Sequence, residues 1–275
     1  MPRARINGID LSFDVHGAGE PVVLVAGTGS PGRIWRTHQV PALKAAGHQV
    51  ITLDNRGLAP DEPGHRHFTL DDMVADVAGL IEHLGAGPCR VLGHSLGGIV
   101  VQELLVARPE LVRQAVLVAS SGRTDEVIRA MAAADLALAD SGITLPPAYA
   151  AFVAALQNLS PRTLNDQEQV RDWLGVFEMS AVNLSSVRGQ LAVDQIPDRL
   201  SAYRSIRRPC LVVAFQDDRI IRPHLSREVA DAVPGALYRE LPGCGHYGYL
   251  EQPDALNSVV IDFFAGRLPA DPQPS

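Results

Sequence analysis

The chain has 275 residues, 46% of them hydrophobic and 20% charged, which is an ordinary globular composition with enough material for a full hydrophobic core. Its net charge of −7 and its pI near 5.7 offer no positive surface, so neither a nucleic acid nor an anionic membrane is expected as a partner. The nine histidines lack metal-ligand spacing, and three cysteines cannot all pair. We therefore expect no metal, and no other cofactor is expected either. Because the sequence has no apolar run of about eighteen residues and no N-terminal apolar segment, we expect a cytoplasmic protein.

Short apolar and β-branched runs, bounded by glycine, proline or polar residues, predict strands in both halves of the chain. An antiparallel pair is expected within residues 5–16, meeting near Gly8. The first of the other runs, residues 21–26, is apolar throughout, as is typical of a strand buried on both faces in a parallel sheet. The remaining runs are residues 49–54, 89–92, 114–119, 209–215 and 236–241.

Helical periodicity separates these strands, and one expected helix carries its own start signal. Thr69 with Asp72 three residues later forms a capping box before a helix that runs to about Leu84. The alternation of strands and helices predicts the α/β class, with a doubly wound, mostly parallel sheet of eight strands. The other helices expected around the sheet are 34–46, 96–108, 223–233 and 253–265.

Residues 123–205 break this alternation, because they contain helical patterns and no strand-like run. An all-helical insertion of this kind belongs over the carboxyl ends of the strands, where such sheets bind ligands. The expected helices are 123–140, 147–158, 166–181 and 184–193. The predicted organisation is a core of residues 1–121 and 206–266, a helical cap (lid) of residues 122–205, and a disordered tail of residues 267–275.

A G-x-S-x-G motif, Gly93-His94-Ser95-Leu96-Gly97, lies between a buried strand and a helix. In that context it predicts a sharp turn that projects the Ser95 hydroxyl as a nucleophile. The helix N-terminus at Leu96 offers free N–H groups where an oxyanion would form. The loop after residues 21–26 is expected to supply a second donor, the N–H of Thr28.

A serine nucleophile needs a base, and the base needs an orienting acid. His246 is the expected base, since it follows the last strand in a glycine-rich loop. His94 is the rival, but its side chain should point away from the Ser95 hydroxyl, into a pocket wall or a core hydrogen bond. We assign the acid to Asp218 because the residues after it return to a helix, and Asp217 remains the alternative.

From about residue 5 to 265 the chain resembles the α/β-hydrolase superfamily with a helical cap. The resemblance is carried by Gly27-Thr28 with Trp35, Asp54-Asn55-Arg56-Gly57, Gly93-His94-Ser95-Leu96-Gly97-Gly98, Asp218 and Gly245-His246. It implies a catalytic triad of Ser95, Asp218 and His246, with Thr28 and Leu96 as the oxyanion hole. The chain looks similar to small bacterial esterases, cofactor-free haloperoxidase-like hydrolases and natural-product thioesterases.

The chain departs from the family pattern at two loops, and its nucleophile is a serine. Ala26-Gly27 stands where the family usually has His-Gly, and residues 57–61 replace its usual Gly-x-Gly-x-Ser. Ser95 argues against epoxide hydrolases and haloalkane dehalogenases, which look similar but carry aspartate at that position.

These residues favour a serine hydrolase that cleaves an ester, thioester or lactone through an acyl-enzyme. The expected partner is a small-molecule substrate, including a carrier-bound acyl group, and the expected oligomeric state is a monomer or homodimer. The same triad would also serve carbon–carbon bond hydrolysis, or a cyclase or lyase, and a ligand receptor on this scaffold is a further alternative. The cap residues considered for lining a largely apolar substrate site, beside His94, are Tyr149, Phe152, Trp173, Phe177 and Met179.

Overall fold

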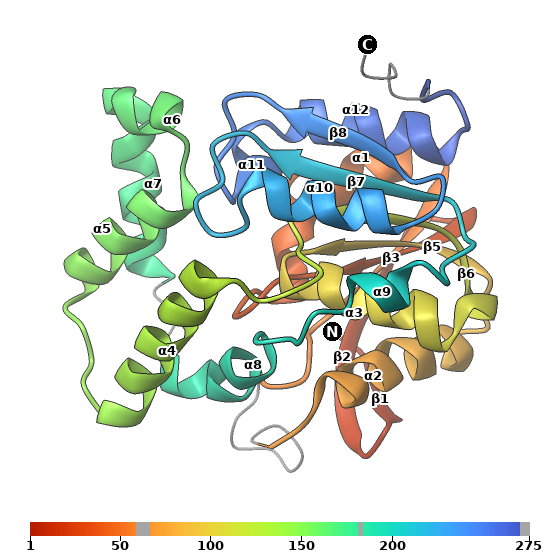
Figure 1. Cartoon of the computed structure of the whole chain (residues 1–275), viewed down its shortest axis with the longest axis horizontal. Coiled ribbons are helices and arrows are strands. Elements are labelled where there is room, and N and C mark those ends of the chain that lie inside the picture. The colour runs from red at the N-terminus through yellow and green to blue at the C-terminus, as the bar shows by residue number, and fades with distance from the viewer. Residues whose placement is uncertain (59–66, 181–183, 270–275) are drawn as a thin grey trace.

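The computed structural model describes residues 1–58, 67–180 and 184–269, and its centre is one eight-stranded sheet (Figure 1). The strand order is β1-β2-β4-β3-β5-β6-β7-β8; β2 is antiparallel to both of its neighbours, β1 and β4, and all other neighbouring strands are parallel. This confirms the predicted sheet. The strands are β1 (Arg3–Ile6), β2 (Ile9–His16), β3 (Glu20–Val25), β4 (His48–Leu53), β5 (Cys89–His94), β6 (Val112–Val118), β7 (Cys210–Phe215) and β8 (Leu237–Leu241).

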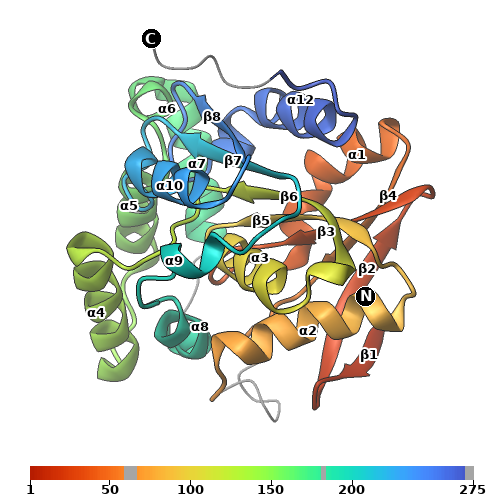
Figure 2. The same cartoon turned by 45° about the vertical axis from the view of Figure 1, so that its right-hand side comes forward.

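Helices cover both faces of the sheet (Figure 2). On one face lie α1 (Gln39–Ala45) and α12 (Pro253–Phe264), and on the other α2 (Leu70–His83), α3 (Leu96–Ala107) and α10 (Pro223–Ala232). The short helices α11 (Gly248–Glu251) and η2 (Pro109–Leu111), the second a 3₁₀ helix, also belong to the core.

Two helix predictions are wrong in detail. The segment expected as a single helix over 184–193 is a 3₁₀ helix over Leu184–Val187 followed directly by an α-helix over Arg188–Val193. The segment expected as a single helix over 34–46 is a 3₁₀ helix, η1 (Gly32–Arg36), followed by α1. Pro41 gives the reason, because its ring lacks an N–H and would clash with a helical carbonyl four residues earlier. A new helix that starts at Gln39 places Pro41 in its first turn, where no N–H is needed.

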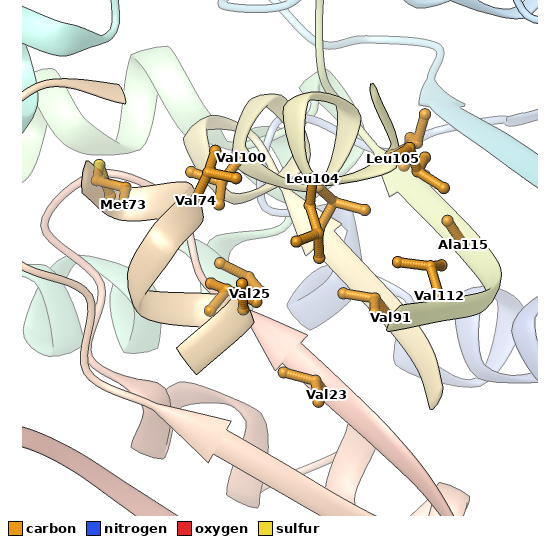
Figure 3. Close-up of a cluster of buried hydrophobic side chains, with 14 of the residues drawn as sticks. Val23, Val25, Met73, Val74, Val91, Val100, Leu104, Leu105, Val112 and Ala115 are labelled. Atoms are coloured by element: carbon orange, nitrogen blue, oxygen red, sulfur yellow. The ribbon is translucent and has the colours of Figure 1, made fainter. Parts of the chain in front are cut away.

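The central strands are buried on both faces, as their continuous apolar runs predict. Along β3, Val22 and Leu24 pack toward α1 and α12, whereas Val23 and Val25 pack toward α2 and α3. Figure 3 shows the second layer, in which α3 inserts Leu104 among side chains of β3, β5 and β6. Burying each such side chain contributes about 1.5–3 kcal/mol, so this packing fixes the positions of the strand ends.

Between β6 and β7 the described residues form helices only, and we call residues 122–205 the helical insertion. Its helices are α4 (Glu126–Ser141), α5 (Pro147–Asn158), α6 (Pro161–Asn165), α7 (Gln167–Met179), η3 (Leu184–Val187), α8 (Arg188–Val193) and α9 (Leu200–Tyr203). In Figure 1 the arrowheads of the parallel strands point toward it. Its two ends run side by side, because the Ile196 N–H donates to the Thr124 hydroxyl at 2.8 Å.

At the C-terminal end, Arg267 still contacts α12, since its N–H donates to the Asp262 carbonyl at 2.8 Å. The rest of the predicted tail, residues 270–275, lies outside the described residues, as do residues 59–66 and 181–183. In the part of the chain that is described, no helix is long and apolar enough to cross a membrane.

Candidate active site

The G-x-S-x-G motif forms the sharp turn that its sequence context predicts. β5 ends at His94, α3 begins at Leu96, and Ser95 between them has φ 54° and ψ −122°. A positive φ is strained for a residue with a side chain, and such strain persists only where the surroundings enforce it. Here the Ser95 N–H donates to the Val118 carbonyl at 3.0 Å, which ties the turn to the end of β6. Ser95 itself is only half-buried.

Two glycines of the motif are required by close backbone contacts. A Cβ at Gly93 would lie 2.2 Å from the Gly97 carbonyl oxygen, and a Cβ at Gly97 would lie 2.2 Å from the Val25 carbonyl oxygen. Neither contact can be relieved by a side-chain rotation, because the obstructing atoms belong to the backbone. The turn therefore allows strand and helix to approach more closely than any larger residue permits.

Replacing Gly97 by alanine is expected to lower the free energy of unfolding by about 1–3 kcal/mol, because the new methyl group forces the strand and helix apart. Gly175 in α7 is the matched control, since a Cβ there meets nothing within 4 Å. Gly175→Ala should instead stabilise the protein, by about 0.5–1 kcal/mol, through helix propensity. Urea unfolding of both variants measures the difference, and equal effects would contradict it.

The structure brings His246 and Asp218 together at the edge of the sheet. His246 Nδ1 lies 2.7 Å from Asp218 Oδ2, and both side chains are buried. The other carboxylate oxygen of Asp218 accepts hydrogen bonds from the N–H groups of Ile220 and Ile221, at 2.8 and 2.9 Å. A carboxylate oxygen only accepts, so Nδ1 is the donor, and in the neutral imidazole the lone pair is then on Nε2. Asp217 makes no comparable contact among the described residues; its N–H donates to the Cys244 carbonyl.

His94 makes a core hydrogen bond beneath this loop. Its side chain is buried, with Nε2 3.0 Å from the carbonyl oxygen of His246. Since a carbonyl only accepts, Nε2 carries the proton and donates it. Burial, with His246 close by, holds the pKa of His94 well below its usual range, so the ring stays neutral. His94 thus supports the backbone of the His246 loop, and its part in substrate binding stays a prediction.

The loop after β3 passes directly beside the nucleophile. A Cβ on Gly27 would lie 3.1 Å from the Ser95 Cβ. The Ser30 N–H donates to the Gly27 carbonyl at 3.1 Å, and Gly29 has φ 69°, as in a type II turn with Thr28 and Gly29 at its centre. We call residues 27–30 the oxyanion loop, after the role predicted for the Thr28 N–H.

Residues at the end of β4 hold this loop from the core side. The Asn55 amide donates to the Ala26 carbonyl at 2.7 Å, and Asp54 accepts from the Gly32 N–H at 2.8 Å. These contacts give a physical role to the Asp54-Asn55-Arg56-Gly57 motif, which fixes the start and the end of the loop.

The helical insertion contributes contacts that sequence reasoning missed. Gln190 of α8 accepts a hydrogen bond from the Gly29 N–H at 2.7 Å, and Asp194 accepts one from the Thr28 hydroxyl at 3.0 Å. On the other side, the Tyr247 N–H next to His246 donates to the Asn158 carbonyl of α5. Only the four-residue spacing of Gln190 and Asp194, which places them on one helix face, could have hinted at such a contact.

The predicted lining residues fall into two groups. Trp173 and Phe177 of α7 stack on each other, with ring centroids 5.4 Å apart, and both pack against Tyr247. Tyr149 and Phe152 of α5 are 55% and 52% exposed. Met179 at the end of α7 is exposed as well. Contact of any of these side chains with a substrate stays a prediction.

The three cysteines offer no competing nucleophile. All are buried and free, and burial raises the pKa of each of their thiols to about 12, so thiolate is scarce at neutral pH. Across the described residues, no group of three or more His, Cys, Asp and Glu side chains is arranged to hold a metal ion.

The strand order, the strained serine turn and the His246 loop beyond β8 together define an α/β hydrolase. Residues 22–259 match the model of the alpha/beta hydrolase family, and the chain belongs to that family.

Two relatives and one solved structure span nearly all of the chain. A Mycobacterium tuberculosis H37Rv protein that carries the name "Putative non-heme bromoperoxidase BpoC" is 46% identical over 258 residues, which are 94% of this chain and 98% of that protein. A crystal structure of BpoC from that organism matches with a TM-score of 0.89 and 44% identity, covering 95% and 97% of the two chains. A "Putative carbamate hydrolase RutD" of Azorhizobium caulinodans is 31% identical over 96% of this chain and 98% of its own length.

Proposed function

We propose that the protein is a serine hydrolase with Ser95, His246 and Asp218 as its catalytic triad. The observation that carries this proposal is the buried 2.7 Å contact between His246 Nδ1 and Asp218 Oδ2. These two residues follow β8 and β7, which belong to the same parallel part of the sheet as β5, the strand that ends at the Ser95 turn. Asp218 keeps the His246 proton on Nδ1, so Nε2 is the base available to the Ser95 hydroxyl.

In the reaction, the Ser95 Oγ attacks the carbonyl carbon of the substrate while His246 Nε2 takes its proton. The negative charge on the carbonyl oxygen is stabilised by the N–H groups of Leu96 and Thr28. Leu96 is the first residue of α3, where an N–H has no intrahelical acceptor. His246 then protonates the leaving group. Water attacks the acyl-enzyme while His246 takes its proton, and His246 returns that proton to Ser95 Oγ as the acid product leaves.

The proposed substrate is an ester, thioester or lactone of medium to large size whose acyl part is mainly apolar. The stack of Trp173 and Phe177 on Tyr247, beside His246, supports an apolar acyl group. The name of the carbamate hydrolase relative supports attack at a carbonyl carbon bearing a heteroatom leaving group. We propose that the helical insertion acts as the cap over this site.

The test combines a serine-directed fluorophosphonate with p-nitrophenyl acetate, butyrate and octanoate. We expect p-nitrophenol release that is lost on labelling, a single phosphonyl adduct that mass spectrometry maps to Ser95, and higher kcat/KM for the longer acyl chains. The longer chains bury more apolar surface, at roughly 0.8 kcal/mol for each CH₂ that leaves water. A folded protein that neither reacts with the fluorophosphonate nor hydrolyses any ester would contradict the proposal and favour the lyase or receptor alternatives.

A further inference from the structure

A helix of the insertion holds the oxyanion loop from outside the core. α8 places Gln190 and Asp194, one turn apart, against two consecutive residues of that loop, Gly29 and Thr28. These contacts join segments more than 160 residues apart in the chain.

Gln190 connects the oxyanion loop with the loop after β4. Its Oε1 accepts the Gly29 N–H at 2.7 Å, and its Nε2 donates to the Arg56 carbonyl at 2.7 Å. The side chain is 0% exposed, so no water replaces either bond if the amide is removed. The Gly29 N–H belongs to the central peptide of the turn, whose orientation is what distinguishes a type II turn from a type I turn.

Asp194 fixes the neighbouring side chain. Its carboxylate accepts a hydrogen bond from the Thr28 hydroxyl, which locks the Thr28 rotamer and holds the hydroxyl in one direction. Asp194 also interacts electrostatically with His246 and with Asp135 of α4. α8 and its C-cap residue thus hold the N–H of the Thr28–Gly29 peptide and the side chain of Thr28.

We propose that Gln190 and Asp194 are positioning residues that keep the oxyanion loop in its catalytic conformation, so that the Thr28 N–H points at the developing oxyanion. The inference rests on the proposed function, because it assigns a cause to the geometry of that oxyanion hole. Transition-state stabilisation by such donors depends on their being fixed before the reaction. The insertion then contributes to the chemical step as well as to substrate binding.

The test is the Gln190→Leu variant, which keeps the apolar volume and removes both hydrogen bonds. With p-nitrophenyl butyrate we expect kcat to fall about 10- to 100-fold with little change in KM, because a misplaced donor weakens only the transition state. A boronic acid that forms a tetrahedral adduct on Ser95 should lose affinity by a similar factor. Arg188→Gln is the control on the same helix, since the Arg188 side chain is exposed and pairs with Asp140 rather than with the loop.

A pair of variants at Asp194 gives a second, independent measurement if Gln190→Leu fails to fold. Asp194→Asn keeps an oxygen that accepts the Thr28 hydroxyl, whereas Asp194→Ala removes it. We expect Asp194→Ala to lose kcat and Asp194→Asn to retain most of it. Equal losses in both variants would contradict the positioning role.

The inference and the proposed function fail in different ways. A folded Gln190→Leu protein with wild-type kcat and wild-type boronate affinity, or one whose loss lies only in KM, overturns the inference alone, because Ser95 still reacts. A wild-type protein whose Ser95 reacts with no fluorophosphonate overturns both.

Discussion

Replacing Ser95 by alanine is expected to reduce kcat for ester hydrolysis by about three decades or more, because no other group can form the acyl-enzyme. His246→Ala should cause a loss of similar size, since the Ser95 hydroxyl is a poor nucleophile without a base to take its proton. The rate of p-nitrophenol release, measured with far-UV circular dichroism to verify folding, gives both values.

The double variant Ser95→Ala with His246→Ala provides the control for this prediction. Residues that act as one unit show strongly non-additive effects, so the double variant should be about as slow as either single variant. If the losses multiplied, the two residues would act independently and the triad assignment would be contradicted. A Ser95→Ala protein with near-normal kcat would remove the acyl-enzyme mechanism.

The second large effect is expected on stability, at the buried ion pair between Arg56 and Asp76. The Arg56 guanidinium donates to both oxygens of Asp76, at 2.6 and 2.7 Å, and the two side chains are only 6% and 3% exposed. The Asn7 amide also donates to Asp76, at 3.0 Å, so this pair links the β1–β2 turn, the loop after β4 and α2. Asp76→Ala should lower the free energy of unfolding by about 3–5 kcal/mol, because it leaves a buried positive charge without its carboxylate.

Urea unfolding measures this loss of stability, which is compared with that of a double variant and that of Glu82→Ala. Replacing the pair by Arg56→Met with Asp76→Leu should recover much of the lost stability, since the buried charge disappears together with its partner. Glu82→Ala removes an exposed ion pair with Arg108 and should change the midpoint far less. If Asp76→Ala shifted the urea midpoint no more than Glu82→Ala does, the prediction would be contradicted, because Arg56 would then have equivalent partners elsewhere.

The larger part of the fold could be predicted from local sequence patterns. The eight strands follow from apolar runs such as residues 21–26, whose alternate side chains indeed enter two different core layers. The Thr69–Asp72 capping box predicted the start of α2 correctly, because a cap depends on neighbouring residues alone. The helix expected over 34–46 was wrong because Pro41 was not used as a break.

The sequence by itself determined the elements of this protein and the candidates for its site. The glycines around Ser95 predict the sharp turn, and the structure adds the distant backbone groups of Val25 and Val118 that hold it. The preference for Asp218 over Asp217 was also an inference from the sequence, and the structure adds the contact that distinguishes them.

Only the tertiary structure decided which distant groups meet around that turn. The bonds of Gln190 and Asp194 to the oxyanion loop, and the core hydrogen bond of His94, join segments separated by more than 150 residues. Such contacts leave no periodicity or spacing in the chain, because they depend on how a separate helical segment packs against loops at the strand ends. Local rules act over a few residues, whereas the geometry of this site is set by packing across the whole molecule.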